Sequence, residues 1–170
     1  MIRHENFPSR HVPPRHVEVW LPPGYDAGHD RYPVLTMHDG QNCFNAADCA
    51  YGAAWEVQHA LARLIAAGEA RRVLEYRPAR PFLTLSETAR QRVLAGMGGP
   101  PLSDDYLAFL VHELKPFIDA TYRTHPGRDD TFIMGSSMGG LISLYALCEY
   151  PDVFGGAACV STHWPAVEGV

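Results

Sequence analysis

The sequence lacks the features that mark membrane, secreted and nucleic-acid-binding proteins. No apolar run reaches the roughly 18 residues of a membrane-spanning helix, and the first residues contain no signal-peptide core. The 14 Lys and Arg residues are scattered and the net charge is −5, so no basic stripe is present for nucleic acid or an anionic membrane. We therefore expect a soluble, cytoplasmic protein with neither kind of partner.

Metal-binding and disulfide patterns are also missing. The four cysteines contain no Cys-x-x-Cys pair, so we expect free thiols, and a bridge between Cys43 and Cys49 would require export. The nine histidines form neither a His-x₃-His nor a His-Glu-x-x-His pattern. The sequence therefore predicts no metal and no cofactor.

The most informative stretch that is present runs from residue 131 to 140. Its apolar start predicts a strand, and the apolar-periodic segment from Met138 to Cys148 predicts a helix. The pattern Gly135-x-Ser137-x-Gly139 at their junction is that of a nucleophile elbow, a strained turn that lifts a serine hydroxyl above a sheet edge. The backbone N–H of Met138, at the helix start, would face an anion beside Ser137. Alone the pattern also recurs by chance, but the strand and helix around it are the context that it needs.

Other predicted strands are few. Residues 1–15 allow at most a weak edge strand, whereas residues 16–21 alternate with a period of two. Residues 33–37 are continuously apolar, which is typical of a strand buried on both faces. The polar cluster 38–42 follows directly, where parallel sheets place their ligands. A last strand is predicted within residues 154–160.

The helices should occupy residues 53–67, 86–95, 103–118 and 138–149. Ser103 or Asp104 can cap the third, and Pro116 predicts a kink or a restart in it. Residues 72–78 read as a charged loop, in which Glu75 and Arg72 either touch substrate or form a surface ion pair. An alternating α/β chain should carry a strand within 69–85, but none is evident. No linker or repeat divides the chain, so we expect one domain over 1–170.

Several motifs in consecutive order resemble the Putative esterase family of α/β-hydrolases, which includes esterase D-like, enterochelin esterase-like and feruloyl esterase-like enzymes. The resemblance extends from Val17 to Trp164 and rests on these stretches: VWLPPGY (19–25), YPVL (32–35), HDGQN (38–42), EYRP (75–78), ELKPFID (113–119), YRT (122–124), GSSMGG (135–140) and PDVFG (151–155). It implies a mostly parallel sheet flanked by helices, with Ser137 as the catalytic nucleophile. It also implies an oxyanion hole built from the backbone amides of Gln41 and Met138.

Two departures from the family pattern stand out. The sequence lacks one inner strand, and it lacks the C-terminal strands whose loops carry the family's catalytic acid and histidine. Neither residue has a matching position here. His163 is the first candidate for a substitute base and His38 the second, although both, like Trp164, can equally line a pocket. We therefore expect a partial α/β-hydrolase domain belonging to a longer enzyme.

Two functional hypotheses follow. The first is a serine carboxylic-ester hydrolase that acts on a small-molecule ester through an acyl-enzyme on Ser137; a thioesterase or acyltransferase would use the same elbow. The second is a non-catalytic hydrolase remnant or a partner-binding module that lacks the base. A homo-oligomer is compatible with either hypothesis.

Overall fold

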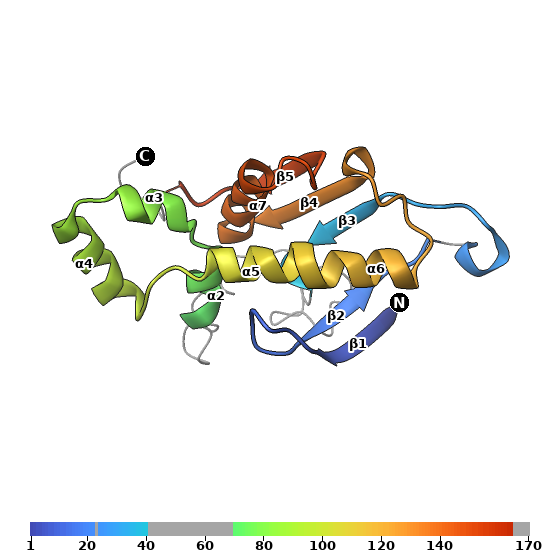
Figure 1. Cartoon of the computed structure of the whole chain (residues 1–170), viewed down its shortest axis with the longest axis horizontal. Helices are drawn as coiled ribbons and strands as arrows, with labels where there is room; N and C mark the ends of the chain where they lie inside the picture. Colours follow the sequence, from blue (N-terminus) through green and yellow to red (C-terminus); the bar gives the residue numbers. More distant parts are fainter. Residues whose placement is uncertain (23, 41–69, 165–170) are drawn as a thin grey trace.

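The strands of the protein form two separate sheets (Figure 1). The computed structural model describes residues 1–22, 24–40 and 70–164. Strands β1 (Ile2–Phe7) and β2 (Arg15–Val19) pair antiparallel. Strands β3 (Val34–Met37), β4 (Thr131–Ser136) and β5 (Gly156–Val160) form a parallel sheet in the order β3-β4-β5. The strands expected within 16–21, 33–37, 131–136 and 154–160 are thus confirmed.

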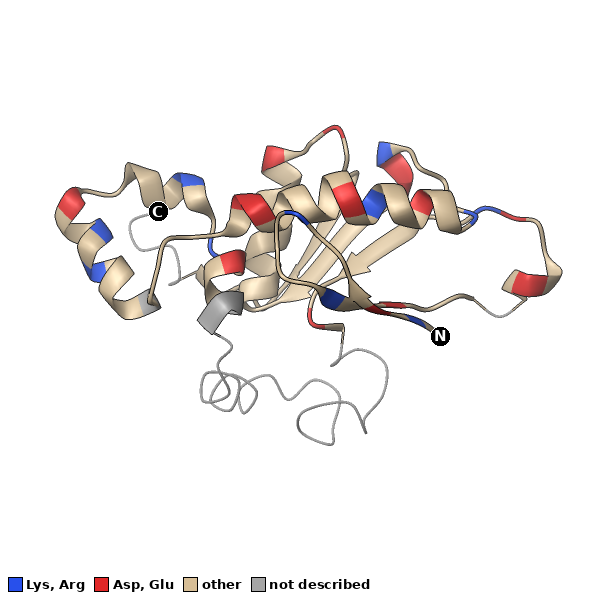
Figure 2. Cartoon of the chain, turned by 60° about the horizontal axis from the view of Figure 1, so that its bottom comes forward, with Lys and Arg blue, Asp and Glu red and all other residues tan. Residues whose placement is uncertain are grey.

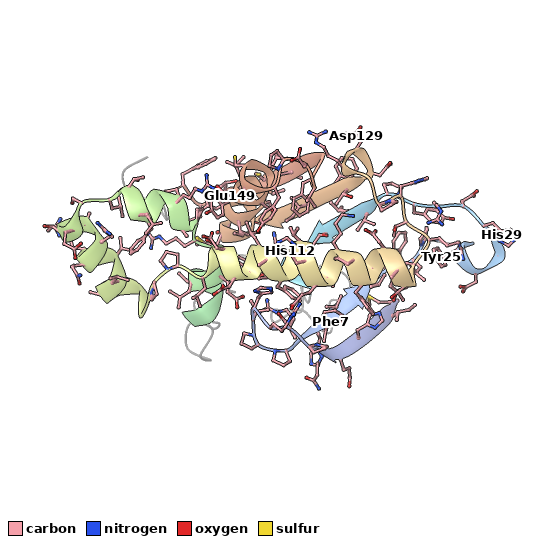
Figure 3. The ribbon with its side chains drawn as sticks, in the orientation of Figure 1. Phe7, Tyr25, His29, His112, Asp129 and Glu149 are labelled. Carbon is pink, nitrogen blue, oxygen red and sulfur yellow. The ribbon has the colours of Figure 1, made fainter. Side chains whose placement is uncertain are left out.

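The N-terminal strand is more substantial than the sequence predicted. Residues 1–15 were expected to give at most a weak edge strand, yet β1 pairs with β2 from Ile2 to Phe7, with one irregularity. Aromatic contacts explain the difference. The side chain of Phe7 is labelled in Figure 3, and its ring lies 4.9 Å from that of Phe117 and 6.2 Å from that of Phe109. His4 Nε2 also bonds the Tyr122 hydroxyl at 2.6 Å. Contacts more than 100 residues away in sequence therefore fix this strand.

The parallel sheet has one covered and one open face among the described residues. Ile133 is fully buried under α7 (Met138–Glu149). On the other face Leu35, Phe132 and Val160 are 51%, 37% and 36% exposed. The expectation that residues 33–37 are buried on both faces is therefore wrong for the described part of the chain, because nothing in that part packs over Leu35.

Three helices follow between residues 70 and 97, and the prediction of a loop at 72–78 is wrong for residues 72–76 and holds only for residues 77–78. The helices are α2 (Ala70–Tyr76), α3 (Ala79–Thr84) and α4 (Glu87–Met97). Tertiary contacts hold α2, since the Leu102 N–H donates to the Leu74 carbonyl at 2.8 Å and Glu75 is ion-paired with Arg15. The predicted helix at 86–95 is confirmed as α4, and the Ser86 hydroxyl accepts a hydrogen bond from the Ala89 N–H as an N-cap.

The third predicted helix is confirmed with an interruption. It consists of α5 (Ser103–Phe109), a π-helical turn (Leu110–Leu114) and α6 (Lys115–Thr121), which together form one rod in Figure 1. The π turn lies just before Pro116, which has no N–H to donate and so favours a change in helical pattern. The capping prediction was wrong, because Leu102 occupies the N-cap and the Ser103 hydroxyl instead accepts from the Ala79 N–H.

The core joins the rod, α7 and the covered face of the parallel sheet. Its most buried side chains are Leu107, Phe109, Ile133 and Ile142. Short 3₁₀ turns at Tyr25–Ala27 and Arg128–Asp130 complete the described elements. The helix expected at 53–67, the residues Cys43 and Cys49, and Gln41 lie outside the described residues.

A cavity of about 930 Å³ lies between the two sheets. Residues of β2 and β3 line it from two sides, and Leu110, Leu114 and Ile118 of the rod line it from a third. Within the described residues β2 and β3 do not pair with each other, and residues 70–85 contain no strand. The sequence showed no strand between residues 69 and 85, and the structure has none in the part of that segment that it describes, residues 70–85.

The charged side chains are mixed along the described helices. Figure 2 shows Lys and Arg interspersed with Asp and Glu, and several pair with each other, such as Lys115 with Asp119 and Arg80 with Glu149. A search of the described helices found none that is both long and apolar enough to cross a membrane.

Candidate active site

Ser137 occupies the sharp turn between β4 and α7, as the sequence predicted. Its backbone has φ 58° and ψ −118°, a conformation that side-chain-bearing residues rarely adopt. Hydrogen bonds fix this turn on both sides: the Ser137 N–H donates to the Val160 carbonyl at 2.9 Å, and the N–H groups of Gly140 and Leu141 donate to the Ser137 carbonyl at 3.1 and 3.2 Å. Hydrogen bonds to β5 and to α7 therefore fix the strained backbone of Ser137.

The glycines of the motif allow the strand and helix to approach. A Cβ at Gly135 would lie 2.5 Å from the carbonyl carbon and oxygen of Gly139, a distance at which the backbone would have to move. A Cβ at Gly139 would lie 3.4 Å from the His38 Cβ. Gly135 is therefore required by direct contact with the helix backbone, whereas a Cβ at Gly139 would make only ordinary contacts with the turn that follows β3.

The start of α7 supplies a backbone donor beside Ser137. Met138 is the first residue of this twelve-residue helix, so its N–H has no partner within the helix and lies at the positive end of the helix dipole. None of the described side chains caps this end. The arrangement suits the amide of Met138 as a donor to an oxyanion. The second predicted donor, Gln41, lies outside the described residues.

Strained backbone is concentrated at this edge of the sheet. Asp39, Ser137 and Ser161 follow β3, β4 and β5, and their φ values are 58°, 58° and 45°. Because the three strands are parallel, their carboxyl ends meet at the same edge. Non-glycine residues in this conformation cluster at functional sites. The three loops thus mark one place on the molecule, with Ser137 at its centre.

His38 is buried behind this edge, only 5% exposed. Its Nδ1 lies 2.8 Å from the Tyr106 hydroxyl, and its ring lies 5.1 Å from the ring of Tyr76. Burial raises the pKa of Tyr106 well above its usual value, so the phenol stays protonated. The sequence suggested His38 as a residue of the active-site pocket. It lines the 930 Å³ cavity together with Asp39 and Gly40, but the described lining of that cavity does not include Ser137.

Asp39 lies beside His38 near the first turn of α7. Strand alternation predicts opposite directions for the side chains of His38 and Asp39. In the structure both side chains approach Gly139. A Cβ added at that residue would lie 3.4 Å from His38 Cβ and 3.6 Å from Asp39 Oδ2. Asp39 has already left the strand and has a left-handed backbone, so the alternation rule does not apply to it.

His163 and Trp164 lie next to the elbow but face outwards. The His163 N–H donates to the Ser137 carbonyl at 3.2 Å, which brings this residue beside the candidate nucleophile. Both side chains are exposed, Trp164 by 58%. Among the described residues no hydrogen bond joins the Ser137 hydroxyl to another side chain, so the described part of the chain contains no preformed serine–histidine pair.

A buried polar cluster was not predicted from the sequence. Glu75 is 5% exposed, and its carboxylate oxygens accept hydrogen bonds from Arg15 at 3.1 and 3.3 Å. The guanidinium of Arg15 in turn lies 5.3 Å from the centre of the Tyr106 ring. Glu75 is therefore not part of a surface ion pair, one of the alternatives considered above. Only the apolar neighbours of Arg15 and Glu75 could have hinted at this pairing, since the two residues are 60 positions apart.

Comparisons with known proteins agree with the fold. A family model described as "Putative esterase" matches residues 12–168. "Uncharacterized protein YbbA" of Bacillus subtilis (strain 168) is 29% identical over 153 residues, which are 88% of this chain and 58% of that protein. "Uncharacterized protein YjcH" of the same organism is 38% identical over 50 residues, 29% of this chain and 21% of that protein.

A solved structure, named as a ferulic acid esterase, shares the fold with a TM-score of 0.54 and 20% sequence identity. The match covers 95% of this chain and 59% of that one. The chain thus spans less than two thirds of the length of each of these proteins.

Proposed function

Since the chain belongs to the Putative esterase family, we propose that it is a serine carboxylic-ester hydrolase whose nucleophile is Ser137. The observation that carries this proposal is the backbone of Ser137, held at φ 58° between a parallel strand and the start of a helix. Such a strained turn at the carboxyl edge of a parallel sheet is what a nucleophile elbow requires, and it supports this role for Ser137.

The proposed reaction proceeds through an acyl-enzyme. Ser137 Oγ bonds to the ester carbonyl carbon while its proton passes to a base, and the negative charge that develops on the carbonyl oxygen is stabilised by the Met138 N–H. The bond to the alcohol then breaks, and the alcohol leaves with a proton. Water attacks the acyl-serine and releases the acid. The resemblance gives the Gln41 amide as the second oxyanion donor.

Two histidines of the described residues are candidates for the base. Of the two histidines beside the elbow, His38 has its Nδ1 engaged with Tyr106, whereas the His163 imidazole is exposed and its own backbone bonds the Ser137 carbonyl. His163 is therefore the first histidine to test. Its replacement by Ala should slow acylation by about 100-fold or more if it takes the serine proton. His29→Ala is the matched control, since His29 is exposed on a loop far from α7 (Figure 3).

The proposal is tested by intact mass spectrometry after reaction with a fluorophosphonate probe. We expect one adduct on the wild-type protein and none on Ser137→Ala. Ser136→Ala is the control, because it removes the adjacent hydroxyl and should leave the adduct in place. A wild-type protein that forms no adduct would refute the activity and favour the non-catalytic remnant. An adduct that is formed equally fast by His163→Ala would show that His163 is not the base.

A further inference from the structure

We infer that Tyr106 is a positioning residue for the candidate nucleophile, acting through His38 on the first turn of α7. This inference rests on the proposed function. Tyr106 lies on α5 and touches neither Ser137 nor a substrate in the mechanism above, so it is not a catalytic residue. Three successive contacts connect its hydroxyl to the elbow.

The first contact is the hydrogen bond between Tyr106 and His38. The two atoms, the phenol oxygen and Nδ1, are 2.8 Å apart, and both residues are 5% exposed. A protonated phenol can donate to Nδ1 of a neutral imidazole, which fixes the direction of the ring. The two rings are also 5.6 Å apart at an angle of 46°. His38 therefore has one defined orientation.

The second contact joins His38 to the elbow helix. The His38 N–H donates to the Met134 carbonyl at 3.0 Å, which continues the β3–β4 ladder. A Cβ added at position 139 would lie 3.4 Å from His38 Cβ and 3.9 Å from His38 Cδ2. A methyl group at position 139 would be in ordinary van der Waals contact with His38 at these distances. His38 therefore lies next to the first turn of α7, and a change in its orientation alters the packing behind that turn.

The third contact lies within the elbow. The N–H groups of Gly140 and Leu141 donate to the Ser137 carbonyl, so a shift of the first helical turn moves Ser137 and the Met138 N–H with it. Oxyanion donors act over a narrow range of distance, about 2.7 to 3.1 Å. A small displacement of Gly139 should therefore lower the rate of acylation without weakening ground-state binding of the ester.

The surroundings of Tyr106 keep its position fixed. Arg15 lies over its ring at 5.3 Å and is anchored by Glu75, and the ring of Tyr76 is 5.2 Å away. The hydroxyl of Tyr106 could serve core stability alone, as that of Tyr145 does when it donates to Asp104 at 2.9 Å. Tyr145 is 7% exposed and lies on α7 itself, which makes it a matched control.

The test compares Tyr106→Phe and Tyr145→Phe in the full chain with two readouts. The first is the hydrolysis of p-nitrophenyl acetate, with Ser137→Ala as the blank. For Tyr106→Phe we expect kcat to fall about fivefold with KM changed less than twofold, as the loss of one buried hydrogen bond implies. The second is amide hydrogen exchange, in which Gly140 and Leu141 should exchange about fivefold faster. For Tyr145→Phe, both kcat and the exchange rates of the Gly140 and Leu141 amides should stay within twofold of the wild-type values.

The two readouts separate the inference from the proposed function. A wild-type protein without Ser137-dependent hydrolysis refutes the function, while hydrogen exchange still decides whether Tyr106 positions the elbow. Equal effects of the two tyrosine variants in exchange would overturn the inference, since they would indicate a general loosening. If Tyr106→Phe does not fold, His38→Leu removes the same bond at similar volume, and it must raise exchange at Gly140 and Leu141 for the inference to hold.

Discussion

Gly135→Ala tests the packing of the elbow most directly. The added Cβ would lie 2.5 Å from the carbonyl carbon and oxygen of Gly139 and 2.8 Å from its Cα. All three are backbone atoms of α7, so no side chain can rotate away to make room. Overpacking of this kind costs about 1 to 3 kcal/mol, and we place Gly135→Ala in the upper half of that range. For a chain of this length the melting temperature should fall by about 4 to 12 °C.

Two other glycines serve as controls in the same assay. A Cβ at Gly140 would lie 2.7 Å from the Thr162 hydroxyl and 3.3 Å from the Gly135 carbonyl oxygen. Because the backbone contact is longer here than at Gly135, Gly140→Ala should cost less, about 1 kcal/mol. Gly96 lies in α4 with no atom within 4 Å of its Cβ position. Gly96→Ala should therefore stabilise the protein slightly, by about 0.5 kcal/mol.

Urea unfolding followed by circular dichroism gives the three free energies. The expected order of stability is Gly96→Ala, wild type, Gly140→Ala, Gly135→Ala. If Gly135→Ala unfolds within about 0.5 kcal/mol of the wild type, the strand and the helix do not approach as closely as described. The account of the elbow, including the need for glycine at position 135, would then be wrong.

Three further predictions concern other parts of the fold. Arg15→Met removes the cation beside the buried carboxylate of Glu75 and should lower the free energy of unfolding in urea by about 3 kcal/mol. Arg3→Met, at a half-exposed ion pair, should lower it by less than about 0.5 kcal/mol. Equal costs would contradict the buried pairing. Hydrogen bonds, first from the Ser9 hydroxyl, lower the pKa of Glu113 below 4.5. The stability that this carboxylate contributes is therefore present above pH 4.5 and is lost as the pH falls through its folded-state pKa. Glu113→Gln should accordingly reduce the acid sensitivity of unfolding below pH 4.5, and an unchanged pH profile would contradict this. Ser86→Ala removes the N-cap of α4 and should cost about 1 kcal/mol, seen as faster amide exchange confined to α4; exchange that rises throughout the chain would argue against a local cap.

The elements around Ser137 could be predicted because their signals are local. The apolar run before Gly135, the small residues that follow it and the periodic segment to Cys148 specify strand, turn and helix within about 20 residues. The end of α4 at Gly98, which has φ 78°, is equally local. Near-neighbour chemistry decides such features, so they can be read from the chain without knowledge of the fold.

Tertiary structure decided the rest. Residues 72–76 carry charges and appear as a loop in the sequence, yet they are helical because Glu75 pairs with Arg15 and Tyr76 packs against His38. The strand at Ile2–Phe7 depends in the same way on aromatic rings from α5 and α6. The link from Tyr106 to His38 spans 68 residues, and no local pattern encodes a contact at that separation. The sequence by itself thus determined the turn that holds Ser137, whereas the side chains that support this turn from behind were selected only when the distant elements packed together.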